Sequence, residues 1–588
     1  MIESVYGKPN PFRHKKSKYI DYPVHGFDTE TPNFTIRLLP ISDGVNDYLY
    51  DVTAENILDI FLEHYDGVKA KSIILFAHNL EYDFTVLMNQ ELKDDNNMQL
   101  AFNQHCYWEY RGCQIYFFNE RPHFGSITFP NGKVIFLKDT TAFFGMMKLS
   151  KLAKILDVEN KLEVDTEDFM KEGIHLDANF RKYAIQDART TALIGGVIMD
   201  FHSMNNIKPC VSGPSMAMSI FRKDYLKEGE ELICPNDKSI RHWELSYHGG
   251  KNGCYYLSPS EHKNVYLYDI NSAYPFAMTK LPNFVNCNYE TEINPKFDKR
   301  KIGIYQISCV SHCNFNSTFD HDFTSLKTLN KTWITSYELH SLLEHNCINK
   351  LKIHAAHFVK QIQGNSPLRK YAITYYKLKQ NTPKDSALYP LYKITMLNSL
   401  YGKFIERRYD ETLDYSLRGP NYNPAIASLI TGHCRAQLHD MEHAGNALHS
   451  ATDSVFTFKK MQTSKELGGI SLEGFGKLQM FRNKVYLFWT RNKPKEGEII
   501  KDKNGLYLEK YAYHGFNGTI HDLIWLWNHR GKPRRQKFKG KWLKKNEYIY
   551  KKMPTSKETL IHKNLKLKMF GMNILKKCLN IDWRNINV

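Results

Sequence analysis

Four acidic residues in the first third of the chain stand where a phosphodiester-cleaving site would need them. Asp28 and Glu30 are two residues apart after a short extended segment, a spacing that directs both carboxylates to one face of a strand. Asp83 follows an apolar strand, and Asp187 lies one turn after Tyr183 near the start of a helix, so these two side chains share a helix face. Four such carboxylates can hold two metal ions about 3.5–4 Å apart, which stabilise the attacking and leaving oxygens of a phosphodiester. An isolated acidic pair is common on strands, so this interpretation depends on all four converging.

Two further acids, Asp269 and Asp453, are far apart along the chain. Asp269 ends a run of β-branched and aromatic residues typical of a strand, and Asp453 lies at a predicted hairpin turn. Between them, residues 398–404 (NSLYGKF) end an apolar segment that we predict to be helical.

The elements that must position these acids alternate in type in the first third of the chain. Residues 71–77 predict a strand and residues 188–201 a helix, which is an α/β pattern. Around residues 205–214 the periodicity gives way to Asn, Pro, Ser and Gly, and we predict a domain boundary there.

The charge of the chain indicates a polyanionic partner. Its 588 residues carry a formal net charge of +18 and a pI near 9.1. Nucleic acid is the usual partner, and an anionic membrane surface is the alternative. The sequence has no apolar run of spanning length and no basic amphipathic anchor, so we expect no membrane partner. Residues 532–577, in which aromatic side chains stand among Lys and Arg, fit a nucleic-acid-contacting lobe better than a solvated helical surface.

Cysteine usage and the start of the chain predict a protein that is not secreted. The 11 cysteines are scattered, which argues against a disulfide framework. Cys309, His312 and Cys313 lie close together, but no second ligand pair follows at a convincing spacing, so simple thiols are preferred to a zinc site. Residues 1–18 are polar and basic and lack the apolar segment of a secretory signal.

The first set of acids resembles, in order and content, the three exonuclease motifs of the proofreading DnaQ-like family, which has an RNase H-like fold. The resemblance implies that Asp28, Glu30, Asp83 and Asp187 are metal ligands and that Tyr183 positions the attacking water.

Other residues of this region enter through the same resemblance. It implies that Asn79 and Tyr82 contact the single-stranded 3′ end, and that Lys161 is the catalytic lysine of a further motif. A Ser/Thr-Leu motif of these relatives is half present, because Thr140 is followed by Thr141.

The second set resembles three motifs of family B DNA polymerases. Residues 269–275 (DINSAYP) resemble motif A, residues 398–402 (NSLYG) motif B and residues 452–454 (TDS) motif C. The resemblance spans nearly the whole chain and implies that Asp269 and Asp453 bridge two Mg²⁺ ions, for which Mn²⁺ can substitute. These ions lower the pKa of the primer 3′-hydroxyl and neutralise charge on the incoming dNTP. Two ions per site are implied for the exonuclease as well.

A nucleotide-binding set follows from these motifs. The resemblance implies that Tyr274 lies under the sugar and excludes a 2′-hydroxyl, and that Tyr401 packs against the nascent base pair. The full implied set is Ser272, Tyr274, Lys377, Lys393, Asn398 and Tyr401.

Further features resemble the protein-primed replicases of small bacteriophages, adenoviruses and linear plasmids. Residues 247–250 (YHGG) resemble a motif that touches template, and Lys484 with Tyr486 resembles the Lys-x-Tyr motif that contacts the primer. The implied DNA contacts are Tyr247, Gly249, Gly250, Lys484 and Tyr486. The implied partners are primer-template DNA, dNTPs, a terminal priming protein and a single-stranded-DNA-binding protein, in a bacterial cytoplasm or another compartment that carries the virus or plasmid.

The resemblance implies an α/β and α+β multidomain fold, in which an RNase H-like exonuclease precedes a right-hand polymerase of palm, fingers and thumb. The expected boundaries are the exonuclease at 1–205, a linker at 206–240, the palm at 241–282 and 425–490, a terminal-protein-region-like insertion at 283–360, the fingers with a short second insertion at 361–424, and a basic thumb region at 491–588.

The sequence departs from the family pattern at three places. Ala451 replaces the first aspartate of motif C, which should weaken the local negative field. Ile394 occupies the slot of the motif B lysine, and Lys393 would lie about 100° away on an α-helix, so we expect Lys377 to carry much of the triphosphate contact. Residues 407–424 are shorter than the hairpin of processive phage replicases, which predicts weaker strand displacement or processivity.

Two alternative functions stay open at this point. One is an active exonuclease whose polymerase site is weakened or inactive, with Ala451 as the sign of decay. The other is a basic nucleic-acid-binding scaffold, which explains the charge but not six ordered acidic motifs. A reverse transcriptase should show a Tyr-x-Asp-Asp turn, which residues 451–453 do not match.

Overall fold

The structure is a computed structural model of the full chain. It describes residues 5–6, 11–31, 36–52, 57–66, 68–92, 106–118, 121–160, 162, 173–255, 260–311, 328–360, 364, 366–410, 415–494, 498–513, 519–528, 535–538 and 541–544.

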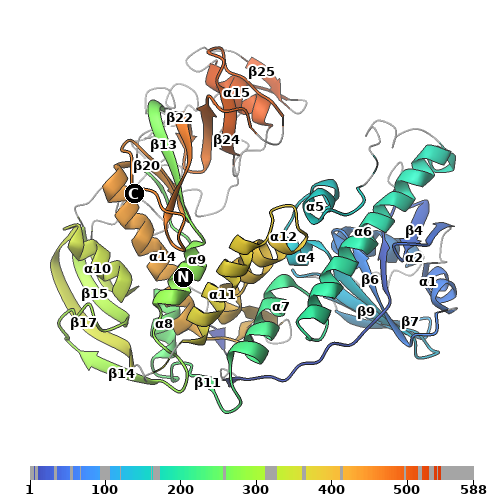
Figure 1. Ribbon diagram of the computed structural model, residues 1–588, viewed down its shortest axis with the longest axis horizontal. Coiled ribbons are helices and arrows are strands. Elements are labelled where there is room, and N and C mark those ends of the chain that lie inside the picture. The colour runs from blue at the N-terminus through green and yellow to red at the C-terminus, as the bar shows by residue number, and fades with distance from the viewer. Residues whose placement is uncertain are drawn as a thin grey trace.

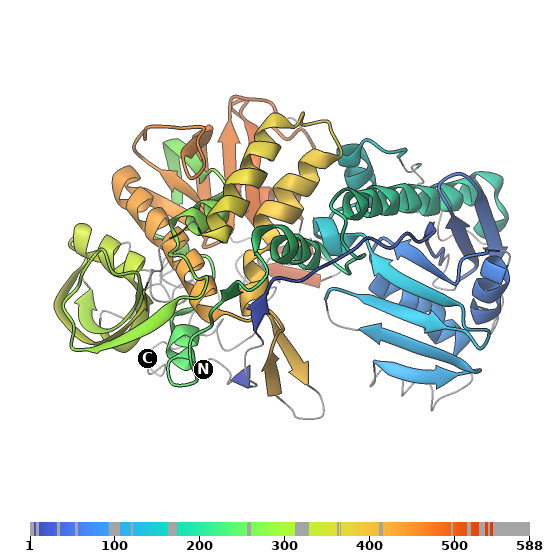
Figure 2. The same cartoon turned by 60° about the horizontal axis from the view of Figure 1, so that its bottom comes forward.

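The first unit is built on an eight-stranded mixed sheet, at one end of the molecule in Figures 1 and 2. The strand order is β5 (Asp47–Asp51), β4 (Leu38–Ser42), β3 (Val24–Phe27), β6 (Ser72–Ala77), β10 (Val134–Asp139), β9 (Phe124–Thr128), β8 (Cys113–Phe118) and β7 (Tyr107–Tyr110). The central strands β3, β6 and β10 run parallel to one another, and the outer ones pair antiparallel. The α/β pattern predicted from the sequence is confirmed.

Strand β6 is apolar at every buried position, so both of its faces must be shielded from water, and helices cover both faces of the sheet. Leu75 faces the cluster formed with α1 (Ile57–Asp66) and α2 (Leu80–Glu91), while Phe76 faces α6 (Ala178–Met204). Helix α6 begins at the N-cap Asp177, whose carboxylate accepts two backbone N–H bonds. Gly26 lets α6 approach β3 directly, since a Cβ there would lie 2.3 Å from the backbone nitrogen of Ala192. The shorter helices of this unit are α4 (Thr141–Phe144), α5 (Leu149–Leu156) and η3 (Ile174–Leu176).

The second unit is built on a seven-stranded sheet at the other side of the molecule (Figure 1). Its strand order is β12 (Asn252–Cys254), β20 (Ala447–Ala451), β21 (Ser454–Thr457), β13 (Ser260–Ile270), β22 (Ile470–Arg482), β23 (Val485–Thr490) and β24 (Tyr507–Tyr513). All neighbouring strands of this sheet pair antiparallel. Helix α14 (Pro424–Gly445) packs against β20 and β21 of this sheet, and α8 (Ile240–Ser246) and α9 (Ala273–Lys280) each pack against α14.

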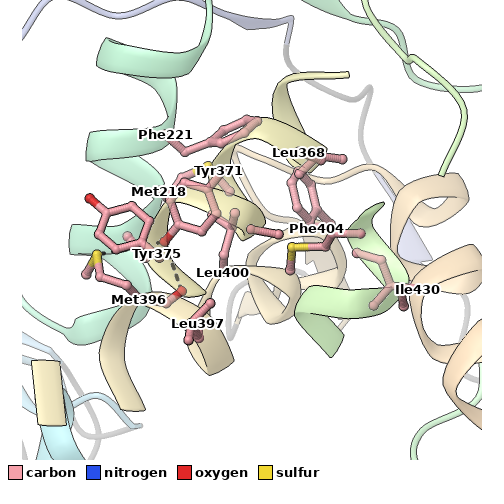
Figure 3. Packing of buried hydrophobic residues seen from close by; sticks show 14 of the residues in the cluster. Met218, Phe221, Leu368, Tyr371, Tyr375, Met396, Leu397, Leu400, Phe404 and Ile430 are labelled. Atoms are coloured by element: carbon pink, nitrogen blue, oxygen red, sulfur yellow. Dashed lines mark hydrogen bonds between the residues drawn. The ribbon is translucent and has the colours of Figure 1, made fainter. Parts of the chain in front are cut away.

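A layer of helices joins the two units, and its buried side chains form one continuous core (Figure 3). The helices are α7 (Gly213–Ile220), η4 (Phe221–Tyr225), α11 (Pro367–Asn381), α12 (Leu388–Pro390), η5 (Leu391–Met396), α13 (Leu397–Ser399) and η6 (Tyr401–Ile405). The Tyr371 hydroxyl donates a hydrogen bond to the Met396 carbonyl, 2.9 Å away, inside this core.

The segment 206–240, expected as a linker, is instead part of this core. Met216, Ile220 and Phe221 are buried there. The apolar residues after the Gly-Pro-Ser run are spaced to form the buried face of helix α7, which Ser212 caps, so the segment between the two units is packed.

Residues 283–360 form a separate lobe with a four-stranded sheet and one helix. The strand order is β14 (Asn288–Ile293), β17 (Ile348–Lys360), β15 (Gly303–Ser311) and β16 (Thr328–Thr335), and helix α10 (Ser336–Glu344) follows β16. A buried ion pair between Glu338 of α10 and Arg435 of α14, 2.7 Å long, ties the lobe to the second unit.

Small elements complete the description. They are the sheet of β1 (Val5–Tyr6), β19 (Tyr415–Arg418) and β18 (Arg407–Asp410), the pair β2 (Phe12–Arg13) and β11 (Glu231–Leu232), helix α15 (Ile520–Asn528), and the hairpin of β25 (Arg535–Phe538) and β26 (Lys541–Lys544). Most of the predicted basic lobe 532–577 lies outside the described residues. Within the part of the chain that the structure describes, no helix combines the length and apolar character needed to cross a membrane.

Two candidate carboxylate sites

The structure brings three of the four acids of the first set into one cluster. Asp28 and Glu30 follow strand β3, and Asp187 projects from helix α6, which packs against that strand. One carboxylate oxygen of each lies within 4.8 Å of the other two. Glu30 and Asp187 are buried, so the three negative charges stand close together with little water to screen them.

The fourth acid, Asp83, joins the cluster from helix α2. Its carboxylate accepts a 2.7 Å hydrogen bond from the Thr29 hydroxyl. Burial, and next the charge of Asp28, raise the pKa of Asp83 well above its usual range. Four acids with this mutual repulsion form a site that a cation stabilises, and carboxylate oxygens are the ligands that Mg²⁺ prefers.

Tyr183 lies one helical turn before Asp187 and beside the same cluster. Burial and the charges of Asp187, Glu30 and Asp28 raise the pKa of its hydroxyl. The hydroxyl is therefore protonated near neutral pH and can donate a hydrogen bond toward the carboxylates.

The loop before α2 is held by an acid that the sequence interpretation missed. Asp139, buried at the end of β10, accepts hydrogen bonds from the backbone nitrogens of Asn79 (3.1 Å) and Thr141 (2.8 Å). The His78 ring nitrogen Nδ1 lies 2.8 Å from the Thr140 hydroxyl. The half-present Thr-Thr motif thus has a local structural role, and an acid ending a buried strand next to β6 was the signal that could have revealed Asp139.

The residues expected to contact a 3′ end lie at the rim of this site. Tyr82 is 49% exposed, and its hydroxyl lies 2.8 Å from the Thr31 hydroxyl. Asn79, the N-cap of α2, has a left-handed backbone with φ of 77° and is partly exposed. Lys161, expected as a catalytic lysine, lies outside the described residues.

The two acids of the second set converge at one end of the seven-stranded sheet. Asp269 on β13 pairs in register with Ser454 on β21, next to Asp453 in the β20–β21 turn. The backbone nitrogen of Ile270 donates a 2.9 Å hydrogen bond to the Asp453 carbonyl. Asp269 and Asp453, which are distant in sequence, are neighbours because β13 and β21 are adjacent strands.

The electrostatics of this pair also favour a bound cation. Burial, and next the charge of Asp453, raise the pKa of Asp269 to about 7. Burial likewise raises the pKa of Asp453. Lys510 of β24, which the sequence interpretation missed, acts on both carboxylates in the opposite direction.

The raised pKa of Asp269 predicts a pH-dependent cost to the metal-free fold. A carboxyl group that binds its proton more tightly when folded destabilises the fold progressively as pH rises from its ordinary pKa of 3.8 to about 7. In EDTA, Asp269→Asn should therefore raise the unfolding midpoint at pH 8 and leave it nearly unchanged at pH 4. Asp502→Asn is the control, because the pKa shift of Asp502 has the opposite sign. Burial acts to raise the pKa of Asp502, but the hydrogen bond from Lys477 helps to lower it below its ordinary value. An Asp269→Asn midpoint that is unchanged at pH 8 would contradict the prediction.

Two tyrosines stack beside this acidic pair. The rings of Tyr274, in α9, and Tyr401, at the start of η6, have centroids 4.1 Å apart at an angle of 15°. Burial, and next the neighbouring Tyr401, raise the pKa of Tyr274. The structure thus brings the expected sugar-contacting and base-pair-contacting residues together.

The Tyr-x-Gly-Gly segment packs directly on the turn that carries Asp453. A Cβ on Gly250 would lie 2.8 Å from Thr452 Cγ2, so only glycine permits this approach. The Arg435 guanidinium donates hydrogen bonds to the His248 and Gly249 carbonyls, the latter 3.1 Å away. Tyr247 of this segment is half-buried.

The Lys-x-Tyr motif lies at the turn between β22 and β23. Lys484 has a left-handed backbone with φ of 57° and is partly exposed. Tyr486 is buried against His449 and Phe456, and burial raises its pKa to about 12. The accessible side chain of this motif is therefore Lys484.

The motif B helix contains a π-helical stretch that corrects one expectation. Residues Leu391–Met396 form η5, in which hydrogen bonds run from i to i+5. Lys393 and Asn398, five residues apart, are both exposed while positions 395–397 between them are buried. The expected offset of Lys393 by about 100° assumed a regular α-helix. The inserted π-helical residue returns Lys393 to the face of Asn398.

A second lysine of α11, which the sequence interpretation did not consider, faces the acids. The Lys379 ammonium donates a 3.2 Å hydrogen bond to the Ser272 hydroxyl, and burial, then the nearby charge of Lys393, lower its pKa. Lys377 is exposed and projects about 200° away around the helix. The triphosphate contact expected of Lys377 stays a prediction, and Lys379 is the stronger candidate because it lies on the side of α11 that faces Ser272.

Sequence and fold comparisons agree with this geometry. Residues 156–416 match the family described as DNA polymerase type B, organellar and viral. The fold is similar to Phi29 DNA polymerase complexed with primer-template DNA, with a TM-score of 0.63 and 15% identity, over 90% of this chain and 98% of that one. Over residues 156–416 the chain is similar to the organellar and viral type B DNA polymerases. The expected fold class, an exonuclease-type α/β unit followed by a right-hand polymerase unit, is confirmed.

Two relatives and a second solved structure are also similar to this chain. It is 29% identical over 212 residues to a probable DNA polymerase of Neurospora intermedia, covering 32% of this chain and 20% of that protein. It is 26% identical over 258 residues to a DNA polymerase of Acidianus bottle-shaped virus, covering 40% of this chain and 37% of that protein. Phi29 DNA polymerase complexed with primer-template DNA and incoming nucleotide substrates matches with a TM-score of 0.59 and 16% identity, over 85% of this chain and 90% of that one.

Proposed function

We propose that this protein is a type B DNA-directed DNA polymerase with a 3′–5′ proofreading exonuclease, and that it starts synthesis from a protein primer. The observation that carries the proposal is the convergence of Asp269 and Asp453 on adjacent strands, beside the stacked Tyr274 and Tyr401. The family match over residues 156–416 and the similar fold support the polymerase assignment. The alternative of a non-enzymatic scaffold does not account for two carboxylate clusters whose charges repel.

In the polymerase site, each residue has a role that follows from its position. Asp269 and Asp453 would hold two Mg²⁺ ions, or Mn²⁺ in their place, which supply charge neutralisation at the triphosphate and activation of the primer hydroxyl. Tyr274, stacked on Tyr401, fills the space where a 2′-hydroxyl would lie and so selects dNTPs. Gly250 lets the template-side segment approach the motif C turn.

In the exonuclease site, Asp28, Glu30, Asp83 and Asp187 would hold the metal ions, which supply activation of water and charge neutralisation at the scissile phosphate. Tyr183, kept protonated by its raised pKa, would orient the water by hydrogen bonding. The exposed Tyr82 would stack on a base of the single-stranded 3′ end.

A pocket between the first unit and the joining helices is proposed as part of the DNA path. Its lining includes Arg121 and Thr141 of the first unit, Lys403 of η6 and Arg407 of β18. Arg121 and Arg407 offer cations to a phosphate backbone from both sides, whereas Lys403 is paired with Glu406, which also lines the pocket. The lobe at 283–360 is proposed to receive the terminal protein. A single-stranded-DNA-binding protein is proposed to cover displaced DNA. Both partners would act with this protein in the cytoplasm of the host or carrier cell.

Primer extension and primer shortening test the proposal together. With a labelled primer-template, Mg²⁺ and dNTPs, the protein should lengthen the primer. With Mg²⁺ and no dNTPs, it should shorten single-stranded 3′ ends. A protein that binds the duplex but changes primer length in neither reaction is a scaffold, and the proposal fails.

The lysine facing Ser272 gives a prediction about nucleotide affinity. Lys379→Ala should raise the apparent KM for dNTP about tenfold, because an ammonium–phosphate contact of about 1.5 kcal/mol is lost. Lys377→Ala, on the opposite face of the same helix, is the matched control and should leave this KM within twofold. Single-nucleotide incorporation over a range of dNTP concentrations measures both. Equal effects of the two variants would contradict the assignment of Lys379.

A second candidate, an exonuclease with a weakened polymerase site, is favoured by one observation. Ala451 lies in the strand β20 position that pairs with Ser454, next to the turn that carries Asp453, and offers no carboxylate. Ala451→Asp would add a negative charge beside the metal-binding pair and should increase the rate of incorporation at limiting Mg²⁺. A native protein that only shortens primers, with extension restored in this variant, would establish the second candidate.

A further inference from the structure

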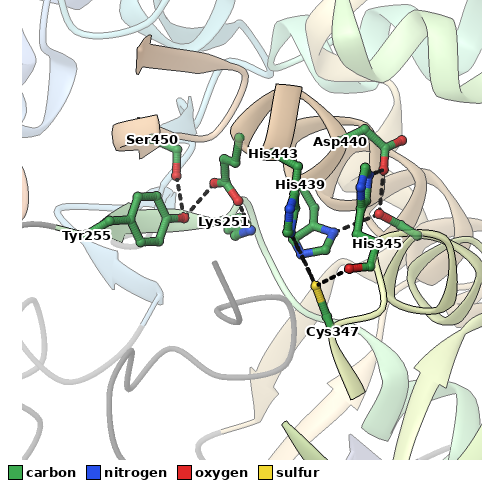
Figure 4. Close-up of polar contacts among 10 residues, drawn as sticks. Lys251, Tyr255, His345, Cys347, His439, Asp440, His443 and Ser450 are labelled. Atoms are coloured by element: carbon green, nitrogen blue, oxygen red, sulfur yellow. Dashed lines mark hydrogen bonds and ion pairs between the residues drawn. The ribbon is translucent and has the colours of Figure 1, made fainter. Parts of the chain in front are cut away.

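A cysteine and two histidines meet where the 283–360 lobe contacts helix α14, away from both carboxylate sites (Figure 4). Cys347 lies just before strand β17, and His439 and His443 are one turn apart on α14. The Cys347 sulfur lies 3.8 Å from His439 Nε2 and 3.2 Å from His443 Nε2, and the two nitrogens are 3.2 Å apart. Cys347 and His439 are buried, while His443 is half-buried.

These separations are those of ligands around one metal ion. In a tetrahedral zinc site, with Zn–N of about 2.0–2.1 Å and Zn–S of about 2.3 Å, neighbouring ligand atoms lie about 3.3–3.6 Å apart. Thiolate and imidazole are the ligands that Zn²⁺ prefers, and Mg²⁺ prefers carboxylates instead. The donor set therefore differs in chemistry from both polymerase and exonuclease sites.

The hydrogen bonds behind the cluster orient His439 for metal binding. The Ser341 hydroxyl lies 2.5 Å from Asp440 Oδ1 and 2.7 Å from His439 Nδ1. Because the ionised carboxylate only accepts, Ser341 donates to Asp440 and accepts from the Nδ1–H of His439. This arrangement leaves the lone pair of neutral His439 on Nε2, the atom that faces Cys347. A ligating histidine whose other nitrogen is fixed by a hydrogen bond is the usual arrangement in metal sites.

A neighbouring histidine fixes the second ring. His345 stacks on His443 with ring centroids 4.2 Å apart and an angle of 4°. His345 Nε2 donates a 3.0 Å hydrogen bond to Asp440. The Asp440 carboxylate therefore binds both Ser341, which contacts His439, and His345, which stacks on His443.

We propose that Cys347, His439 and His443 bind one Zn²⁺ ion, with water in the fourth position, as a structural clip between the lobe and α14. The two segments are distant in sequence, and the ion would fix them to each other beside the ion pair of Glu338 and Arg435. Helix α14 leads directly into β20, which leads into the Asp453 turn. The clip would therefore hold the end of the helix that precedes this strand and turn. Sequence inspection missed this site because its ligands come from two segments without a short spacing motif.

Zinc titration of the metal-stripped full chain tests the proposal. In excess Mg²⁺, and with a chromophoric chelator as competitor, the native protein should bind one equivalent of Zn²⁺ more than Cys347→Ser does. Cys309→Ser is the matched control, since Cys309 is buried in the same apolar cluster of the lobe and lies outside the site. The control should retain the extra equivalent. Comparing variants removes any Zn²⁺ held by the carboxylate sites.

Cobalt gives a second readout that only a thiolate produces. The Co²⁺-loaded protein should show thiolate-to-cobalt charge-transfer absorption, which Cys347→Ser abolishes. His443→Gln should also remove the extra equivalent of Zn²⁺. Because His443 is half-buried, this variant still tests the site if Cys347→Ser fails to fold. Ser341→Ala should weaken Zn²⁺ binding about 10–100-fold through loss of the bond that orients His439. Equal zinc content in the native protein and His443→Gln, or Co²⁺ binding without charge-transfer absorption, would overturn the proposal.

Discussion

Asp453→Asn should reduce nucleotide incorporation about 10³-fold and leave exonuclease activity within twofold of the native rate. The substitution keeps the side-chain shape but removes one charge from the pair that would hold the metal ions. Metal-ion stabilisation of the transition state contributes several kcal/mol, and each loss of about 1.4 kcal/mol slows the reaction tenfold. Single-turnover extension of a labelled primer by one nucleotide measures the effect directly.

The matched control for this substitution is Glu261→Gln. Glu261 is an exposed carboxylate on β13, the strand that also carries Asp269, but it lies at the far end, where Gln479 donates to it. This variant should extend primers at the native rate. An equal loss in both variants would mean that the strand itself was disturbed, and native incorporation by Asp453→Asn would refute the two-acid polymerase site.

Much of the site was predictable because its residues lie at element ends that local sequence reveals. Asp28 and Glu30 follow a short strand, and Asp269 ends a long apolar one. Acids at such positions project from the edge of a sheet, so their convergence follows once the strands pair. The resemblance to family B motifs then connected Asp269 to Asp453, which no local pattern could do.

The sequence could not show facing direction and register, which depend on tertiary packing. The sequence of α11 does not state which side packs inward, so Lys379 was not considered beside Lys377. A helical projection with 3.6 residues per turn does not detect the π-helix η5, and it therefore placed Lys393 away from the face of Asn398. The Gly, Pro and Ser residues within 206–240 indicate a connector, although Ser212 caps the buried helix α7.

Asp28→Asn should have the complementary effect, with excision of single-stranded 3′ ends reduced about 10³-fold and extension retained. Its carboxylate lies within 4.8 Å of Glu30 and Asp187 and raises the pKa of Asp83, so it belongs to the cluster that would bind the cations. Loss of metal-ion stabilisation at the scissile phosphate has the same scale as in the polymerase site. Asp21→Asn is the control, because Asp21 is an exposed acid shortly before β3 and outside the cluster.

The two activities should separate because the two clusters lie on different sheets. Asp28→Asn should extend a matched primer at the native rate but should also extend a mismatched primer without first removing the mismatch. Asp453→Asn should do the reverse, removing the mismatch and then failing to extend. A labelled primer with a 3′-terminal mismatch, incubated with all four dNTPs and resolved by length, shows both outcomes in one assay. If Asp28→Asn still trims the mismatch, the cluster of Asp28, Glu30 and Asp187 is not the exonuclease site, whatever the polymerase variants do.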